Sequence, residues 1–139
     1  MNTRFPLAVS ALLVFCLAAP AAGHAQTMTT MSRAVVDKDF TTPWAAVETM
    51  IRAAKAEDVE TLALCFDRRT EEAFVPYRDA TATPRQLDAL SEWAWEAHVI
   101  EVEMDGSRDA VVHVRFPPED RPWPMKVVRT SDGWKVSGR

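Results

Sequence analysis

Four side chains have the chemistry that proton transfer at a carbon atom requires. His98 opens an alternating strand pattern on its apolar side, where burial tunes an imidazole for acid–base work near neutral pH. Tyr77, the only tyrosine, is a candidate oxyanion donor, and Asp79 or Asp67 is a candidate base. The pattern leaves the facing of the last three open. His98 also fits a plainer interpretation, a core-edge histidine that donates to a backbone carbonyl.

Metal and thiol chemistry have less support. With regular alternation, His98 and His113 fall on opposite faces of a sheet, so they cannot share one metal ion. Cys65 comes three residues after Leu62 and directly before Phe66. This setting favours a small buried hydrophobe over a reactive thiol. We therefore predict no metal site and no cofactor.

Tryptophans are the other candidate functional residues, and the chain has five of them. Trp44, Trp93 and Trp134 occupy positions that fit a core or the wall of a pocket. Together with His98, they are the predicted ligand-binding residues. Trp123 lies between two prolines in an expected exposed loop, where it either anchors a partner or covers the sheet edge.

Three helices are expected to position these side chains. Thr42, followed by proline, is expected to cap the first helix, and Asp58 caps a shorter second one. Thr83 and Gln86 form the capping-box pattern of a third helix. Between the second and third helices, residues 74–77 contain a proline, which limits them to an edge strand or an irregular segment.

From His98 onward the apolar period changes to two, which is typical of strands. A regular register pairs Met104 with Ala110 and Ile100 with Val114 across a turn. Gly133 is placed for the positive φ of a later hairpin turn. The pattern predicts an α+β domain, with N-terminal helices packed on a curved, mainly antiparallel sheet.

The first part of the chain has the composition of a targeting signal. Residues 5–22 are almost wholly apolar, and Gly23 and Ala25 fit positions −3 and −1 of a signal-peptidase site. We therefore expect cleavage after Ala25 and a secreted, periplasmic protein. An uncleaved membrane anchor is the alternative, because the stretch is about long enough to span a bilayer. The expected organisation is a signal peptide over 1–25, a flexible lead-in over 26–40 and one domain over 41–139.

Charge excludes some partners. The chain carries 16 Lys and Arg against 20 Asp and Glu, a net charge of −4, which argues against binding nucleic acid or an anionic membrane. One expected sheet face carries Glu101, Glu103, His113 and Arg115. Because such charge disfavours a large obligate interface, we expect a monomer or a weak homodimer, with no stable membrane anchor after cleavage.

The order of elements resembles the nuclear transport factor 2-like superfamily, also called cystatin-like or cone-shaped, over residues 42–137. The resemblance rests on three segments: PWAAV at 43–47, EDVE at 57–60 and DGWKV at 132–136. None of these is a catalytic motif, so they support the fold more than the function.

The resemblance implies a pocket between the helices and the concave sheet face. Some members of the superfamily are ketosteroid isomerase-like or polyketide cyclase-like enzymes, and many are binding or assembly modules. We therefore expect a domain that binds a small apolar or amphipathic ligand. The alternatives are an isomerase-, dehydratase- or cyclase-like enzyme in the same pocket, and a protein-interaction module of the cell envelope.

Overall fold

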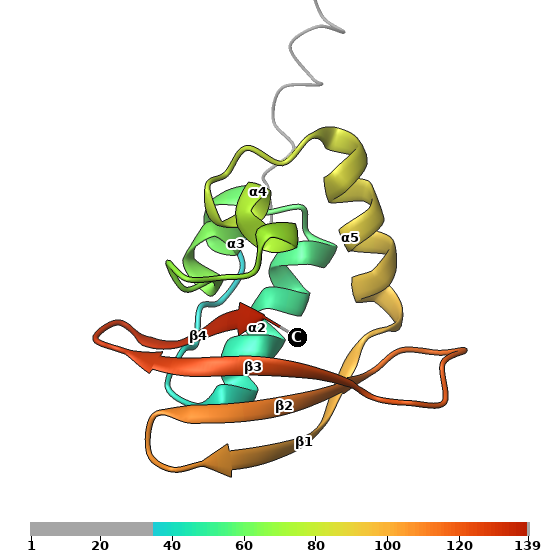
Figure 1. Ribbon diagram of the computed structural model, residues 1–139. Helices are drawn as coiled ribbons and strands as arrows, with labels where there is room; N and C mark the ends of the chain where they lie inside the picture. The colour runs from blue at the N-terminus through green and yellow to red at the C-terminus, as the bar shows by residue number, and fades with distance from the viewer. Residues whose placement is uncertain (1–34, 139) are drawn as a thin grey trace, which may run out of the picture. The chain divides into compact units, whose positions relative to one another are not determined.

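The computed structural model describes residues 35–138, in which helices precede a sheet. The helices are α2 (Pro43–Lys55), α3 (Val59–Cys65), the 3₁₀ turn η1 (Glu72–Phe74), α4 (Val75–Arg78) and α5 (Pro84–Glu96). The strands are β1 (His98–Asp105), β2 (Asp109–Arg115), β3 (Trp123–Thr130) and β4 (Gly133–Gly138), which form one antiparallel sheet in sequence order. Figure 1 shows the helices gathered on one face of this sheet. The predicted α+β class is confirmed.

The helices begin where their capping residues predict. The Thr42 side chain accepts from the Ala45 amide at 3.0 Å, and Asp58 accepts from the Thr61 amide at 3.1 Å. At α5, both hydrogen bonds of the Thr83–Gln86 capping box are present. These contacts satisfy amides that the first turn of a helix leaves unpaired.

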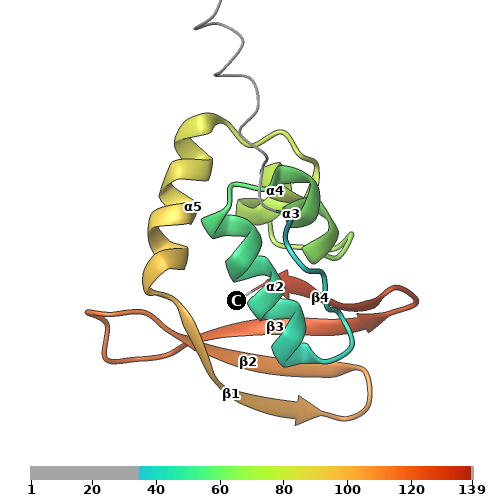
Figure 2. The same cartoon turned by 180° about the vertical axis from the view of Figure 1, so that it is seen from behind.

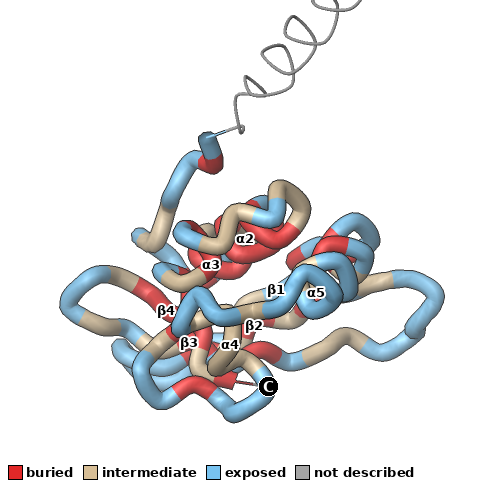
Figure 3. The backbone as a smooth tube through the Cα atoms, turned by 90° about the horizontal axis from the view of Figure 1, so that it is seen from above, coloured by how far each residue is buried: buried red, intermediate tan, exposed pale blue. Residues whose placement is uncertain are grey.

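The core lies between α2 and the middle of the sheet. Figure 2 shows α2 crossing above the strands, and Figure 3 shows buried residues along that helix. Val47 and Met50 of α2 belong to this core, and both are at most 1 % exposed. Other fully buried side chains are Leu62, Val112, Val114, Val127 and Val136. No helix among residues 35–138 is long and apolar enough to cross a membrane.

The register of β1 and β2 is as predicted near the turn and differs at the other end. Met104 faces Ala110 as expected, but Val99, rather than Ile100, pairs with Val114. The register shifts between Val99 and Glu101, and such a bulge reverses the facing of the residues beyond it. Val99 is consequently buried and His98 is exposed. The expectation that His98 shares the apolar face is therefore wrong.

Residues 74–77 differ from the expected strand or irregular segment. They run from the end of η1 into α4, with Pro76 in the first turn of α4. A proline there sacrifices no helical hydrogen bond, because the first-turn amides have no partner within the helix. The same proline that argues against a central strand is therefore compatible with a helix start.

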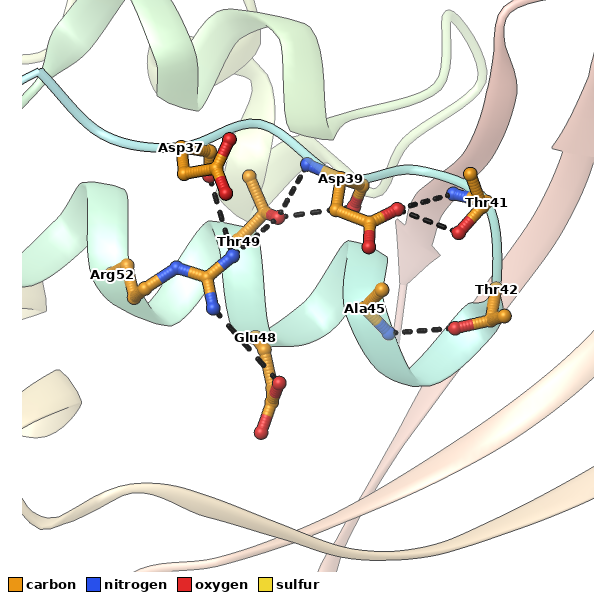
Figure 4. A network of polar contacts seen from close by, with 8 residues as sticks. All are labelled: Asp37, Asp39, Thr41, Thr42, Ala45, Glu48, Thr49 and Arg52. Carbon is orange, nitrogen blue, oxygen red and sulfur yellow. Dashed lines mark hydrogen bonds and ion pairs between the residues drawn. The ribbon is translucent and has the colours of Figure 1, made fainter.

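The segment before α2 is attached to that helix by a polar network (Figure 4). Thr49, which is fully buried, accepts from the Asp39 amide at 3.1 Å and donates to the Asp39 carbonyl at 3.0 Å. Arg52 donates to the Asp37 carbonyl at 3.3 Å, and Val36 joins the core. The described part of the expected lead-in is thus packed against the domain. The expected signal peptide and its cleavage site after Ala25 lie outside the described residues.

The two edges of the sheet differ in what protects them from pairing with another chain. Beside β4, Phe66 forms a parallel bridge with Val136, and the Asp67 amide donates to the Val136 carbonyl at 2.8 Å. At the other edge, β1 exposes Glu101 and Glu103. Acidic side chains on an edge strand oppose its pairing with another chain.

Candidate functional site

A cavity of about 110 Å³ lies between the helices and β3. Its lining residues come from four elements: Met50 from α2, Phe74 from η1, Leu90 and Trp93 from α5, and Trp123 and Met125 from β3. All six are apolar or aromatic. The α5 stripe that carries Leu90 and Trp93 follows from helical periodicity, which turns one face of the helix toward the sheet.

The two tryptophans that line the cavity, Trp93 and Trp123, are linked by the ring of Phe116. The rings of Trp93 and Phe116 meet edge to face with centroids 6.0 Å apart, and those of Phe116 and Trp123 do so at 4.7 Å. Edge-to-face contacts of this kind add to the stability that burial supplies. The Trp123 indole Nε1 donates to Glu119 Oε2 at 2.6 Å, so the β2–β3 connection is attached to a residue of the cavity lining.

Trp93 also carries a polar atom. Its indole Nε1 is buried and has no hydrogen-bond partner among the described residues. A buried donor without an acceptor carries a desolvation cost. The cavity surface itself is wholly apolar, so this donor is enclosed by the protein and does not open into the cavity.

The volume limits the ligand. Ordinary small-molecule pockets occupy roughly 300–1,000 Å³, so this cavity is small. A dry apolar cavity of roughly 150 Å³ in another protein binds benzene. The space here therefore suits a single ring or a short alkyl chain.

Of the predicted ligand-binding residues, Trp93 lies at the cavity and the other three lie elsewhere. Trp44 is 38 % exposed at the start of α2, and Trp134 is 5 % exposed within the core. His98 is exposed at the start of β1, and its Nδ1 lies 3.4 Å from the Glu96 carbonyl oxygen. Its position leaves it outside the cavity because the bulge in β1 turns it away from the core.

The candidate acid–base residues are also outside the cavity. The Tyr77 hydroxyl donates to the Gln86 carbonyl at 3.1 Å, while burial raises the Tyr77 pKa. The Arg78 guanidinium donates to Asp79 at 2.7 Å and lowers the pKa of that carboxyl. Both shifts oppose the proposed roles, because a donor acid is weakened by a raised pKa and a base by a lowered one. Asp67 accepts from the Arg69 amide at 3.1 Å, away from this cavity.

Sequence reasoning missed most of the cavity lining. Met50 and Leu90 are recognisable as stripe residues, but a stripe does not distinguish a filled core from a cavity. Trp123 differs from the expected exposed loop residue, because it begins β3, pairs with Val114 and is only partly exposed. The sequence does indicate that Trp123 can return to the vicinity of Phe116, because only seven positions, enough for one loop, separate the two residues.

The fold and the cavity define an α+β domain with a small apolar space between its helices and its sheet. A family model described as a protein of unknown function (DUF2950) matches residues 37–139, and the chain belongs to this family. No curated protein matches the chain, and no solved structure does. Among residues 35–138, no cluster of three or more His, Cys, Asp or Glu side chains is arranged to hold a metal ion.

Proposed function

We propose that this protein binds a small apolar or amphipathic ligand in the cavity between α2, α5 and β3. The observation that carries the proposal is the lining of six apolar or aromatic residues, which offers no polar surface to a ligand. An apolar ring or short chain fits this lining, because neither needs a polar partner there. Phenol and short-chain alcohols represent this class.

The binding interpretation is favoured over an enzyme because of where the polar groups are. An isomerase-like reaction needs a base and donors around one reacting atom. Tyr77 and Asp79 are each engaged by other groups, and His98 is exposed. None of these three residues lines the cavity, so the cavity offers only apolar contacts.

The proposal is tested by titrating phenol and benzene into isotope-labelled protein and following the cavity residues by NMR. Both compounds should perturb resonances of Leu90 and Met125, and benzene should bind at least as tightly as phenol, because the lining offers no partner for the phenol hydroxyl. Leu90→Trp fills the space with a larger side chain, so the affinity for both compounds should fall about tenfold or more. Trp95→Phe, on the exposed part of the same helix, is the matched control. Perturbations that appear only outside the cavity would contradict the proposal.

An envelope protein-interaction module is the second candidate, supported by Trp95. This side chain is 68 % exposed on α5, with the Lys55 Nζ 5.5 Å from the centroid of its ring. Exposed tryptophans are enriched at protein interfaces. Trp95→Ala should abolish a cross-link to an envelope protein if this function holds, and should leave binding in the cavity unchanged.

We also propose that the protein is secreted to the periplasm, with cleavage after Ala25, and that its fold is related to the nuclear transport factor 2-like superfamily. The first rests on the apolar residues 5–22 and the small residues before position 26. The second rests on helices followed by a four-stranded antiparallel sheet. N-terminal sequencing of the protein from periplasmic extract tests the first, since an unprocessed Met1 would contradict it.

A further inference from the structure

A second hollow, separate from the apolar cavity, lies between the end of α3 and the β3–β4 turn. It has a volume of about 390 Å³, which is within the range of small-molecule sites. Figure 1 shows α3 close to β4 in the same region. The lining residues are Ala63, Leu64, Phe66, Asp67 and Arg68 on one side and Thr130, Ser131, Asp132 and Lys135 on the other. We call this hollow the Lys135 cleft.

Lys135 is the unusual residue of the cleft. Its side chain is only 8 % exposed, yet its Nζ donates to the Leu64 carbonyl and lies 3.8 Å from the centroid of the Phe40 ring. Both partners are neutral. Among the described residues, no carboxylate lies within ion-pair distance of this ammonium. Neutral partners offset only part of the desolvation cost of a buried ammonium. A ligand carboxylate would supply the negative partner that is missing.

The surroundings of Lys135 indicate that its charge is poorly hydrated. Burial lowers the pKa of Lys135, whereas the charge of Asp132 acts in the opposite direction. Desolvation outweighs the opposing attractions of Cys65 and Asp132, so the ammonium is only partly compensated by its neighbours. The Lys135 cleft therefore presents a cation that is already largely desolvated in the folded protein and can form a charge-assisted hydrogen bond with an anionic group.

The other charges of the cleft define the ligand further. Arg68 adds a second cation, while Asp67 and Asp132 add two carboxylates. A simple anion would be attracted by one pair and repelled by the other. A zwitterion satisfies both, because its carboxylate pairs with the cations and its ammonium with the aspartates.

We propose that the Lys135 cleft binds a small zwitterion of the α-amino acid class, with the ligand carboxylate on Lys135 and Arg68 and its ammonium on Asp132 and Asp67. The cleft volume accommodates one amino acid. The apolar members of the lining, Ala63, Leu64 and Phe66, provide a surface for a small aliphatic side chain. This site is independent of the apolar cavity, with which it shares no lining residue.

The experiment compares three probes on the full chain by NMR titration: L-alanine, propionate and ethylamine. Alanine should perturb amides on both sides of the cleft, over 63–68 and 130–135. Each singly charged probe should bind about tenfold more weakly or worse, because it loses one charge-assisted contact. Propionate that binds as tightly as alanine, or alanine shifts that appear elsewhere, would overturn the proposal, as would no alanine shifts at all.

Variants assign the contacts. Lys135→Met keeps the length of the side chain and should abolish alanine binding, whereas Lys126→Met, exposed on β3 and outside the lining, should not. If Lys135→Met fails to fold, Asp132→Asn at the exposed turn tests the zwitterion assignment instead. It should weaken alanine about tenfold and leave propionate as strong or stronger. Alanine affinity that is unchanged in Asp132→Asn would refute the zwitterion assignment.

Discussion

At the residue scale, Lys135 and Cys65 show how burial changes chemistry. The Lys135 ammonium is held by a carbonyl and a ring, and the Cys65 thiol donates to the Thr61 carbonyl at 3.2 Å. Both side chains are buried, and in each case desolvation disfavours the charged form. The direction of the pKa shift differs because the lysine is charged when protonated and the cysteine when deprotonated.

Cys65 should be chemically inert in the folded protein. Burial raises the pKa of its thiol to about 12, and only the thiolate reacts readily. Modification by a disulfide reagent at neutral pH should therefore be slow in buffer and fast in guanidinium chloride. Cys65→Ala, which retains Cys16, serves as the blank, and fast modification of the native protein beyond this blank would contradict the buried position of Cys65.

Lys135 should make stability increase with pH. Its pKa is lowered by burial from the ordinary 10.5, so between the folded and unfolded values the unfolded chain binds more protons. Stability then rises as pH increases through this window toward 10.5. Urea unfolding at several alkaline pH values should show this slope in the natural protein and a reduced slope in Lys135→Met. Tyr77, with its raised pKa, acts oppositely in both proteins, so the difference between them isolates Lys135.

At the element scale, segments are held by a few contacts at their ends. Thr49 anchors the segment before α2, and the Trp134 amide donates to the Phe40 carbonyl at 2.9 Å. The β3–β4 turn therefore meets the same segment that α2 holds. Gly133 lies at this junction, with φ at +102° and an added Cβ only 2.6 Å from the Phe40 oxygen.

Two glycine variants separate backbone strain from crowding. Gly106 also has a positive φ, +73°, but an added Cβ there meets no atom within 4 Å among the described residues. Gly106→Ala should lower the free energy of unfolding by about 1 kcal/mol, which is the conformational cost alone. Gly133→Ala should lower it by about 3 kcal/mol or more, because the carbonyl must also move. Equal losses in urea unfolding would show that the Phe40 contact is unimportant.

Thr49 should contribute more to the free energy of unfolding than Thr41, its neighbour in the network. Thr49→Val leaves the Asp39 amide and carbonyl without their partner inside the protein, and should cost about 1–3 kcal/mol of unfolding free energy. Thr41 is exposed and donates to the Asp39 carboxylate at 2.6 Å. Thr41→Val is the matched control and should cost less than about 1 kcal/mol. Loss of amide-exchange protection at Asp39 in the Thr49 variant alone would confirm the anchor.

At the scale of the whole molecule, the open β1 edge governs association. Glu101 and Glu103 are exposed there, and Glu103 lies 3.1 Å from the His113 Nε2. We expect a monomer or a weak dimer, since like charges oppose pairing of two β1 strands. Replacing both glutamates with valine should produce concentration-dependent association in sedimentation velocity, while Glu48→Val on α2 should not. A tight dimer of the natural protein at low concentration would contradict this expectation.

Much of the fold was predictable from local signals. Thr42, Asp58 and Thr83 cap helices as expected, and Gly133 occupies its predicted turn. The candidate site was less predictable. Trp93 was expected at a pocket and lines the cavity, but the facing of His98 depended on a regular strand, and the bulge at Ile100 removed that basis.

The sequence by itself determined the α+β class, the helix starts and most of the β1–β2 register, because caps, turns and alternation act between residues a few positions apart. Only the tertiary structure decided the bulge, the apolar cavity and the burial of Lys135. Each of these depends on groups that are distant in the chain. The Lys135 ammonium and the Leu64 carbonyl, for example, are 71 positions apart, and no local pattern records which carbonyl a lysine will reach.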